Sequence, residues 1–184
     1  MLFRSYEACP GIVSGVLDRF AALTGRRYAP FDYDGAPDAE RVVVAMGSGA
    51  QTVRETALWL AARGHKVGAL TVRLYRPFDT AGFLEELPRT VRAVAVLDRT
   101  KEPGSVGEPL FLDVVAALAD APAEFPVRPV VIGGRYGLSS KEFTPGMAAA
   151  VFEELTRPQP KRAAVGPPRR ASCRPMSSIF TIKA

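Results

Sequence analysis

Cysteine and histidine are scarce in this chain of 184 residues. It contains two cysteines, Cys9 and Cys173, and one histidine, His65. Zinc sites and iron–sulfur clusters take most of their ligands from these two residue types. Two cysteines that lie far apart in the sequence also give no cysteine framework of the kind that small secreted domains use. The sequence therefore predicts no metal site and no disulfide framework built from this chain alone.

Long apolar runs are absent as well. Crossing a membrane takes about 18 consecutive apolar residues, and no segment approaches that length. Met1 is not followed by the basic, apolar and small-residue pattern of a secretory signal. With 47% hydrophobic and 23% charged residues, the composition predicts a globular protein of the cytoplasm that makes no membrane contact.

Acidic residues are missing from the last part of the chain. Residues 157–184 contain seven of the 24 Lys and Arg residues and none of the 19 Asp and Glu residues, so the net charge of +5 comes from this tail. Many prolines and no apolar period predict that the tail is disordered. Seven positive charges suit phosphates or an acidic partner, but only Phe180 offers a stacking surface. Nucleic-acid binding through the tail is therefore the least favoured hypothesis.

Short apolar runs alternate with helical periodicity between residues 41 and 156. Strands buried on both faces are predicted at Arg41–Met46, Lys66–Arg73, Ala93–Asp98 and Pro129–Gly133. Helices are predicted over residues 49–63, 80–87, 108–119 and 145–155. This order indicates the α/β class, with an open, mainly parallel sheet and helices on both faces.

Two segments precede the first of these strands. The first is an amphipathic helix that ends at Gly25, with an apolar stripe made of Ile12, Val13, Val16, Leu17, Phe20 and Leu23. Such a stripe needs a surface to cover it, so deleting residues 1–25 should harm the fold more than deleting residues 158–184. Residues 26–40, with two prolines, a glycine and three aspartates, predict a connector without regular structure. The expected organisation is a helix and connector (1–30), an α/β domain (31–156) and a basic disordered tail (157–184).

Glycines and charged residues gather where the predicted strands end. Gly47, Ser48 and Gly49 follow the first strand and open a helix, at the place where an α/β sheet offers N–H groups to an anion. The dinucleotide fingerprint lacks its third glycine here, and a Walker lysine is missing. The favoured alternative is a tight turn in which Ser48 caps the helix.

Four basic residues follow the next two strands, namely Arg73, Arg76, Arg99 and Lys101. Because parallel strands end at one edge of a sheet, we expect these side chains to gather there, near residues 133–141. Docking of a neighbouring domain is favoured for them over substrate binding. An equally weighted alternative for the loop after the third strand is an ion-pair network among Asp98, Arg99, Lys101, Glu102 and Glu108.

Serine next to Lys141 suggests a nucleophile and a base, but no nucleophile elbow is present. The histidine that a common triad needs is His65, which precedes the second strand and so belongs to the opposite edge of the sheet. No catalytic residue is predicted in this chain.

Several ordered strings of sequence resemble one family. They are Ala36–Ser48, Val72–Phe78, Ala95–Gly104 with Gly107–Leu110, and Gly133–Pro145. Together they resemble the second domain of pyruvate:ferredoxin (flavodoxin) oxidoreductase, in order over residues 1–156. Gly49-Ala50-Gln51 departs from the residues usual in that family, which leaves any specific role for that turn open.

The resemblance implies a fold like the C-terminal domain of transketolase and a part in the oxidative decarboxylation of pyruvate to acetyl-CoA. In that family thiamine diphosphate, magnesium, [4Fe–4S] clusters and coenzyme A are bound by other domains, the enzyme is a homodimer, and electrons pass to ferredoxin or flavodoxin. This chain lacks the cluster cysteines and resembles an excised module. The expected role is therefore structural, docking to the other domains, without catalysis by the chain alone. The alternative function is a stand-alone anion- or nucleotide-binding module.

The resemblance ends in the tail. A family member would run on into another domain after Lys161, whereas this sequence turns rich in Arg, Pro, Ala and Ser. A reading-frame shift or a gene remnant explains that change, and a short protein with a basic arm is the alternative; the composition favours the first.

Overall fold

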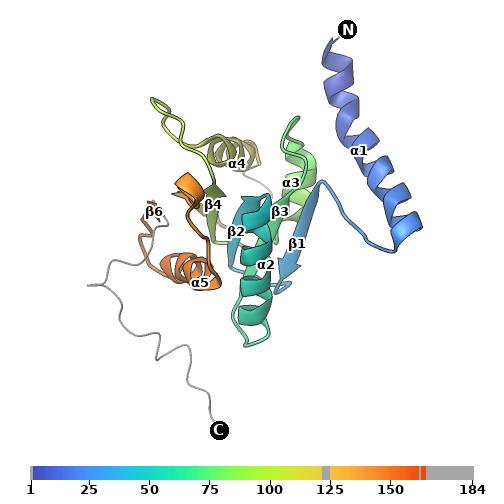
Figure 1. Ribbon diagram of the computed structural model, residues 1–184. Helices are drawn as coiled ribbons and strands as arrows, with labels where there is room; N and C mark the ends of the chain where they lie inside the picture. Colours follow the sequence, from blue (N-terminus) through green and yellow to red (C-terminus); the bar gives the residue numbers. More distant parts are fainter. Residues whose placement is uncertain (1, 122–124, 162, 165–184) are drawn as a thin grey trace.

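The computed structural model describes residues 2–121, 125–161 and 163–164, which form a six-stranded sheet with helices around it (Figure 1). The strand order is β1-β3-β2-β4-β5-β6, and neighbouring strands are parallel except for β1, which pairs antiparallel with β3. The predicted mainly parallel sheet is confirmed. The strands are β1 (Phe31–Gly35), β2 (Arg41–Met46), β3 (Val67–Val72), β4 (Ala93–Asp98), β5 (Val130–Arg135) and β6 (Ala163–Ala164).

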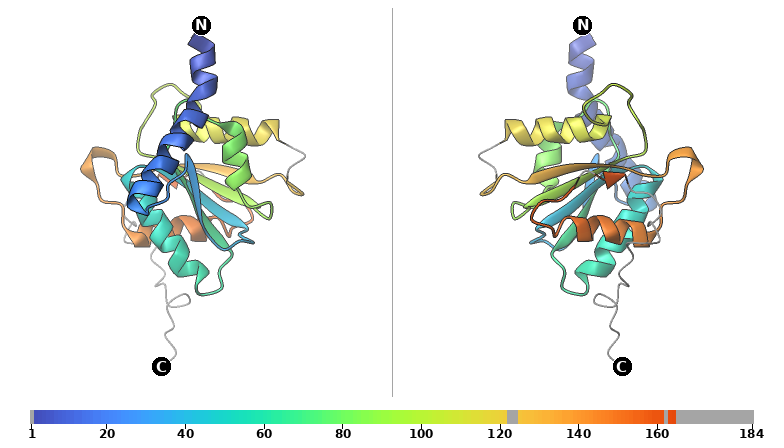
Figure 2. Two further views of the ribbon diagram at one scale, coloured as in Figure 1. Left: turned by 90° about the vertical axis from the view of Figure 1, so that its right-hand side faces the viewer. Right: turned by 90° about the vertical axis from the view of Figure 1, so that its left-hand side faces the viewer.

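Helices cover both faces of the sheet, as the side views show (Figure 2). Helices α3 and α4 pack on one face with Val42 and Val44, and α2 and α5 pack on the other with Val43 and Ala45. Successive side chains of a strand point to opposite faces, so a strand buried on both sides reads as one continuous apolar run. The helices are α2 (Ser48–Ala61), α3 (Thr80–Glu86), α4 (Pro109–Asp120) and α5 (Pro145–Glu154).

The segment that we expected to be an irregular connector contains the edge strand β1, so that prediction was wrong. Phe31 is buried in the core beside α3, and Asp32 and Asp34 form ion pairs with Arg73 and Arg54. These two aspartates, which suggested a turn in the sequence, are thus paired with one arginine that directly follows β3 and one from α2. Tyr33 packs over Gly68, where a Cβ would collide with its ring, and this close approach joins the strand to β3.

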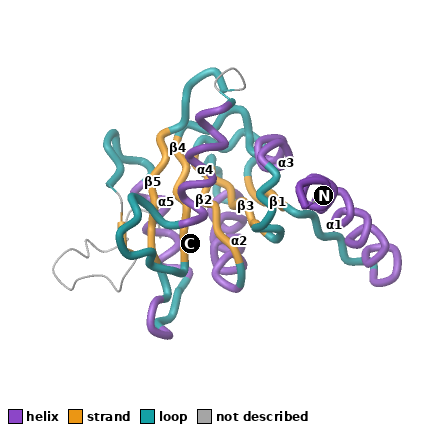
Figure 3. Tube along the Cα trace, turned by 90° about the horizontal axis from the view of Figure 1, so that it is seen from above, coloured by secondary structure: helices purple, strands orange, loops and turns teal. Residues whose placement is uncertain are grey.

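The N-terminal helix α1 (Leu2–Thr24) stands apart from the layers on the β1 side of the sheet (Figures 1 and 3). It ends where Gly25 adopts a φ of 72° and its N–H donates to the carbonyl of Ala21. The helix predicted from the apolar stripe is confirmed. Within the residues that the structure describes, the surface expected to cover that stripe is not found, because Ile12, Val16 and Leu23 are exposed.

The basic tail falls largely outside the described residues. Within it, Ala163 and Ala164 form β6 beside Gly134 and Arg135 of β5, so this part of the tail is a short strand rather than the irregular chain that we expected.

Among the residues that the structure describes, no helix combines the length and the apolar character that a membrane crossing requires.

Candidate functional site

The carboxyl ends of β2, β3, β4 and β5 lie at one edge of the sheet, because these strands are parallel. Four loops meet this edge: the turn at Gly47, the segment from Arg73 to Asp79, the loop 99–108, and residues 136–144 after β5. Open α/β sheets bind ligands along this edge. The glycine, arginine and lysine candidates lie in these loops or at the start of α2.

The turn after β2 is shaped by an aromatic ring from the loop after β5. Gly47 has a φ of 69° and precedes α2, whose first residue is Ser48, and no side chain caps the helix. The predicted cap by Ser48 is therefore wrong. Gly49 faces Tyr136 so closely that an added Cβ would lie 2.6 Å from Cζ of the ring. The need for glycine at this position follows from this contact, without an anion.

Tyr136 is held by polar and aromatic contacts. Its hydroxyl donates to the carbonyl oxygen of Met46 over 3.2 Å, and its ring lies 4.6 Å from that of Phe143. Burial raises the pKa of the Tyr136 phenol above its usual value, so the hydroxyl stays a donor. No role was predicted for Tyr136 from the sequence, although its position between Gly134 and Gly137 was the available signal.

Arg73 and Arg76 follow the same strand but have different neighbours. Arg73 Nε lies 2.5 Å from Oδ2 of Asp32 on β1, and its guanidinium lies 4.5 Å from the ring centre of Tyr28. Arg76 Nη1 lies 2.6 Å from Oδ2 of Asp113 on α4. One arginine thus contacts the β1 edge and the other contacts α4. Each has a carboxylate partner within the domain.

The carboxylate at the end of β4 holds the start of α4. Asp98 is fully buried and accepts hydrogen bonds from the N–H groups of Leu110 and Phe111 at 3.0 and 3.1 Å. These groups belong to the first turn of the helix, where N–H groups lack intrahelical partners. Burial raises the pKa of Asp98, and the two backbone hydrogen bonds oppose that shift. Asp98 therefore acts as a structural cap supplied from the preceding strand.

The second buried carboxylate of this loop, Glu108, holds the loop itself. One oxygen accepts from the N–H of Glu102 over 2.7 Å, and the other pairs with Arg135 of β5. Arg99 instead donates its Nε–H to the carbonyl of Gly137 over 3.2 Å. The expected ion-pair network among Asp98, Arg99, Lys101, Glu102 and Glu108 is therefore wrong for the two buried carboxylates, whose partners are backbone amides and Arg135.

The remaining basic candidate, Lys101, is exposed in the loop 99–108. Arg73, Arg76 and Arg99 each have a separate neighbour, and the gathering of the four basic candidates at this edge stays a prediction. Binding of an anion by these residues stays a prediction.

The loop after β5 carries a short 3-10 helix, Leu138–Ser140, in which Ser139 and Ser140 have φ angles of 55° and 59°. His65 lies between α2 and β3, at the amino end of that strand. The serines and the histidine are therefore at opposite edges of the sheet, as predicted, and the geometry offers no triad.

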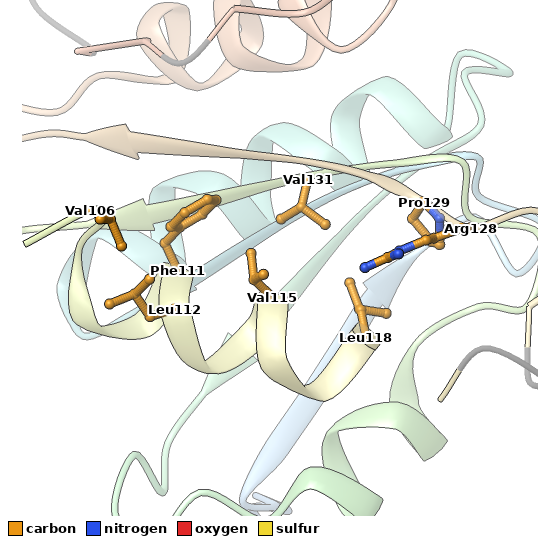
Figure 4. Close-up of a pocket in the computed structure, with 8 residues that line it drawn as sticks. All are labelled: Val106, Phe111, Leu112, Val115, Leu118, Arg128, Pro129 and Val131. Carbon is orange, nitrogen blue, oxygen red and sulfur yellow. The ribbon is translucent and has the colours of Figure 1, made fainter. Parts of the chain in front are cut away.

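The sequence did not predict the apolar groove between α4 and β5. Figure 4 shows Leu112, Val115 and Leu118 of α4 facing Val131 of β5, with Arg128 at one end. The groove has a volume of about 400 Å³. Its signal in the sequence was that α4 is apolar at every position except Asp113 and Asp120, so its apolar surface is wider than one buried stripe.

The domain defined by this sheet belongs to a family of 2-oxoacid oxidoreductase domains. The model of pyruvate:ferredoxin oxidoreductase core domain II matches residues 39–141, and the chain is a member of that family. The resemblance noted from the sequence is thereby confirmed.

Long curated relatives share most of this chain. It is 62% identical over 162 residues to the pyruvate-flavodoxin oxidoreductase of Rhodospirillum rubrum, covering 86% of this chain and 14% of that protein. It is 54% identical over 156 residues to the pyruvate:ferredoxin oxidoreductase of Moorella thermoacetica, covering 85% of this chain and 13% of that protein. The chain thus spans about one seventh of the length of these relatives.

A solved structure, the 2-oxoglutarate:ferredoxin oxidoreductase from Magnetococcus marinus, is similar with a TM-score of 0.47 and 21% identity, over 76% of this chain and 21% of that one. At that score it adds nothing to the fold described above.

Proposed function

We propose that this chain serves as the core-domain-II part of a pyruvate:ferredoxin or pyruvate:flavodoxin oxidoreductase, where it has a structural and docking role. Membership of the family and the small share of each relative that the chain covers support this role. Residues 31–156 form the folded unit of this proposal, with the helix before it and the basic tail after it as appendages.

The chemistry belongs to other domains in this proposal. The whole enzyme decarboxylates pyruvate with thiamine diphosphate and magnesium, forms acetyl-CoA and passes electrons through [4Fe–4S] clusters to ferredoxin or flavodoxin. A [4Fe–4S] cluster takes four thiolates, and this chain has two cysteines. The partners are the remaining domains of a homodimeric enzyme in the cytoplasm.

The observation that carries the proposal is the internal use of polar groups at the carboxyl edge. Asp98 caps α4, Glu108 pairs with Arg135, and Arg99 bonds the loop after β5. A catalytic acid or base must reach the proton that it transfers, whereas the buried carboxylates of Asp98 and Glu108 are occupied by contacts within the domain. Such contacts suit a rigid surface against which other domains pack.

The test joins the chain to an enzyme that has the other domains. Residues 1–156 replace the aligned segment of the Rhodospirillum rubrum oxidoreductase, and reduction of methyl viologen is followed with pyruvate, coenzyme A and thiamine diphosphate. We expect turnover by this hybrid and none by the chain alone or by the enzyme without the segment. Turnover by the isolated chain, or full turnover without the segment, would contradict the proposal.

A further inference from the structure

Helix α1 leaves four side chains of its apolar stripe exposed in the described part of the chain. Ile12, Val16, Phe20 and Leu23 follow one another at intervals of four, four and three residues, which places them on one side of the helix. Ile12 is 63% exposed and Leu23 is 86% exposed. Contiguous apolar patches of this kind on a folded protein mark interaction surfaces.

The α/β domain does not need this stripe for its own core. Both clusters of buried residues, one on each face of the sheet, consist of residues from Phe31 onward. The family model begins at residue 39, after the helix. The stripe is therefore an addition to a domain that is already closed.

The helix nevertheless has a defined attachment to the domain. The ring of Phe20 lies 6.0 Å from that of Tyr28, and Tyr28 lies under the guanidinium of Arg73 at 4.5 Å. Arg73 in turn pairs with Asp32. This series of contacts joins the end of α1 to β1 and β3, so the stripe is presented beside the β1 edge of the sheet (Figure 3).

We propose that the stripe of α1 docks against an apolar face of another domain of the same oxidoreductase polypeptide. This inference rests on the proposed function and adds the surface through which the domain attaches. The Rhodospirillum rubrum relative is about six times as long as this chain, so the rest of such a polypeptide supplies surfaces that this chain lacks. A covalently linked partner is held at high effective concentration, and a small contact then suffices.

Two other occupants fit the stripe less well. A stable interface between separate proteins takes roughly 800 Å² and 20–30 residues from each partner, and four side chains of one helix provide much less for a second copy. Helices that lie on membranes carry a Lys- and Arg-rich polar face. In α1, Arg4 and Arg19 are matched by Glu7 and Asp18, so the helix has no basic excess.

The experiment compares Val16→Asp with Gly11→Asp, in the isolated chain and in the hybrid enzyme defined above. Gly11 is the matched control because a Cβ there meets open space and the residue lies away from the stripe. Hydrogen exchange of residues 8–24 is measured by mass spectrometry. We expect exchange in the hybrid to be at least tenfold slower than in the isolated chain. Val16→Asp should abolish that protection, and Gly11→Asp should leave it.

The outcomes separate the possible occupants. Equal exchange of α1 in the hybrid and in the chain alone would overturn the inference. So would an isolated chain that is dimeric by light scattering and becomes monomeric with Val16→Asp, or one whose binding to anionic vesicles is lost with that substitution. Leu23→Ser is a milder second variant if the Val16→Asp hybrid does not assemble, and it should also lose protection.

The inference and the proposed function fail in different ways. A hybrid that turns over normally while α1 stays unprotected contradicts the docking surface and leaves the proposed function standing. A hybrid with a protected α1 and no turnover contradicts the function and leaves the docking surface standing.

Discussion

Replacing Gly49 by alanine tests whether the turn after β2 is shaped by packing. The new Cβ would lie 2.6 Å from Cζ of Tyr136, a ring that is buried and held between Phe143 and the carbonyl of Met46. Overpacking of a core costs about 1–3 kcal/mol, and loss of the Tyr136 hydrogen bond costs about 1 kcal/mol. The higher helix propensity of alanine returns up to about 1 kcal/mol. We therefore expect Gly49→Ala to lower the free energy of unfolding by about 2 kcal/mol.

Gly146→Ala is the matched control. Gly146 is the second residue of α5, as Gly49 is the second residue of α2, and its Cβ would meet only the Thr144 hydroxyl at 3.8 Å. Here the gain in helix propensity is not opposed, so Gly146→Ala should leave stability unchanged or raise it by up to about 1 kcal/mol.

Urea unfolding followed by the fluorescence of Trp59, the single tryptophan of the chain, measures both variants. A slope of about 1–3 kcal/mol per molar urea converts the loss into a midpoint lower by about 1 M. In a Tyr136→Ala background, Gly49→Ala should lose most of its effect, since the ring that it strikes is gone. If Gly49→Ala unfolds at the wild-type midpoint, the packing explanation is wrong. Close approach of a ligand to the turn would then be the better explanation for glycine at this position.

Three further substitutions or deletions address the loop carboxylates and α1. Burial raises the pKa of Asp98, so the folded state binds the proton more tightly than the unfolded state does. The resulting stabilisation is present below the unfolded pKa of about 3.9 and is lost as the pH rises through the folded pKa. The urea midpoint of the wild type should therefore fall over this pH range relative to that of Asp98→Asn. Arg135→Met leaves the buried Glu108 carboxylate without its guanidinium partner. The free energy of unfolding in urea should fall by about 2 kcal/mol, which is less than for a fully buried pair because Arg135 is half-exposed. A loss as small as that of Arg76→Met, under about 1 kcal/mol, would count against this role. Deleting residues 1–25 should change the free energy of unfolding by no more than about 0.5 kcal/mol, because both clusters of buried residues lack residues of α1. This expectation replaces the larger loss expected from the sequence. A larger loss by calorimetry would show that α1 stabilises the α/β domain.

The parallel strands were predictable because short continuous apolar runs between helices are typical of strands that are buried on both faces. Arg41–Met46 and Ala93–Asp98 begin and end where the sequence placed them. Strands buried on both faces carry a signal within a few adjacent residues. β1 carried no such signal, since Asp32 and Asp34 are turn formers whose arginine partners, Arg73 and Arg54, come from later elements.

The location of the candidate site was predictable, and the contacts in it were not. Strand ends in a parallel sheet meet at one edge, which is enough to bring the glycine-rich and charged loops there. Which carboxylate meets which donor depends on strand order and loop conformation. Asp98 therefore binds the amides of Leu110 and Phe111, although Arg99 is its neighbour in sequence.

The internal pairing at the carboxyl edge bears on what this domain can contribute to a larger enzyme. Asp98 accepts a hydrogen bond from the start of α4, at the end of the loop 99–108, and Glu108 accepts one from Glu102 within the loop. The ion pair between Glu108 and Arg135 joins the loop to β5. Buried charges held by hydrogen bonds resist rearrangement, because a shift would leave them unpaired. The edge therefore keeps its shape without a ligand, while α1 presents the apolar residues that the domain leaves uncovered. A polar edge held by internal contacts and an exposed apolar helix fit the proposed role, in which the domain packs between the other domains of the enzyme.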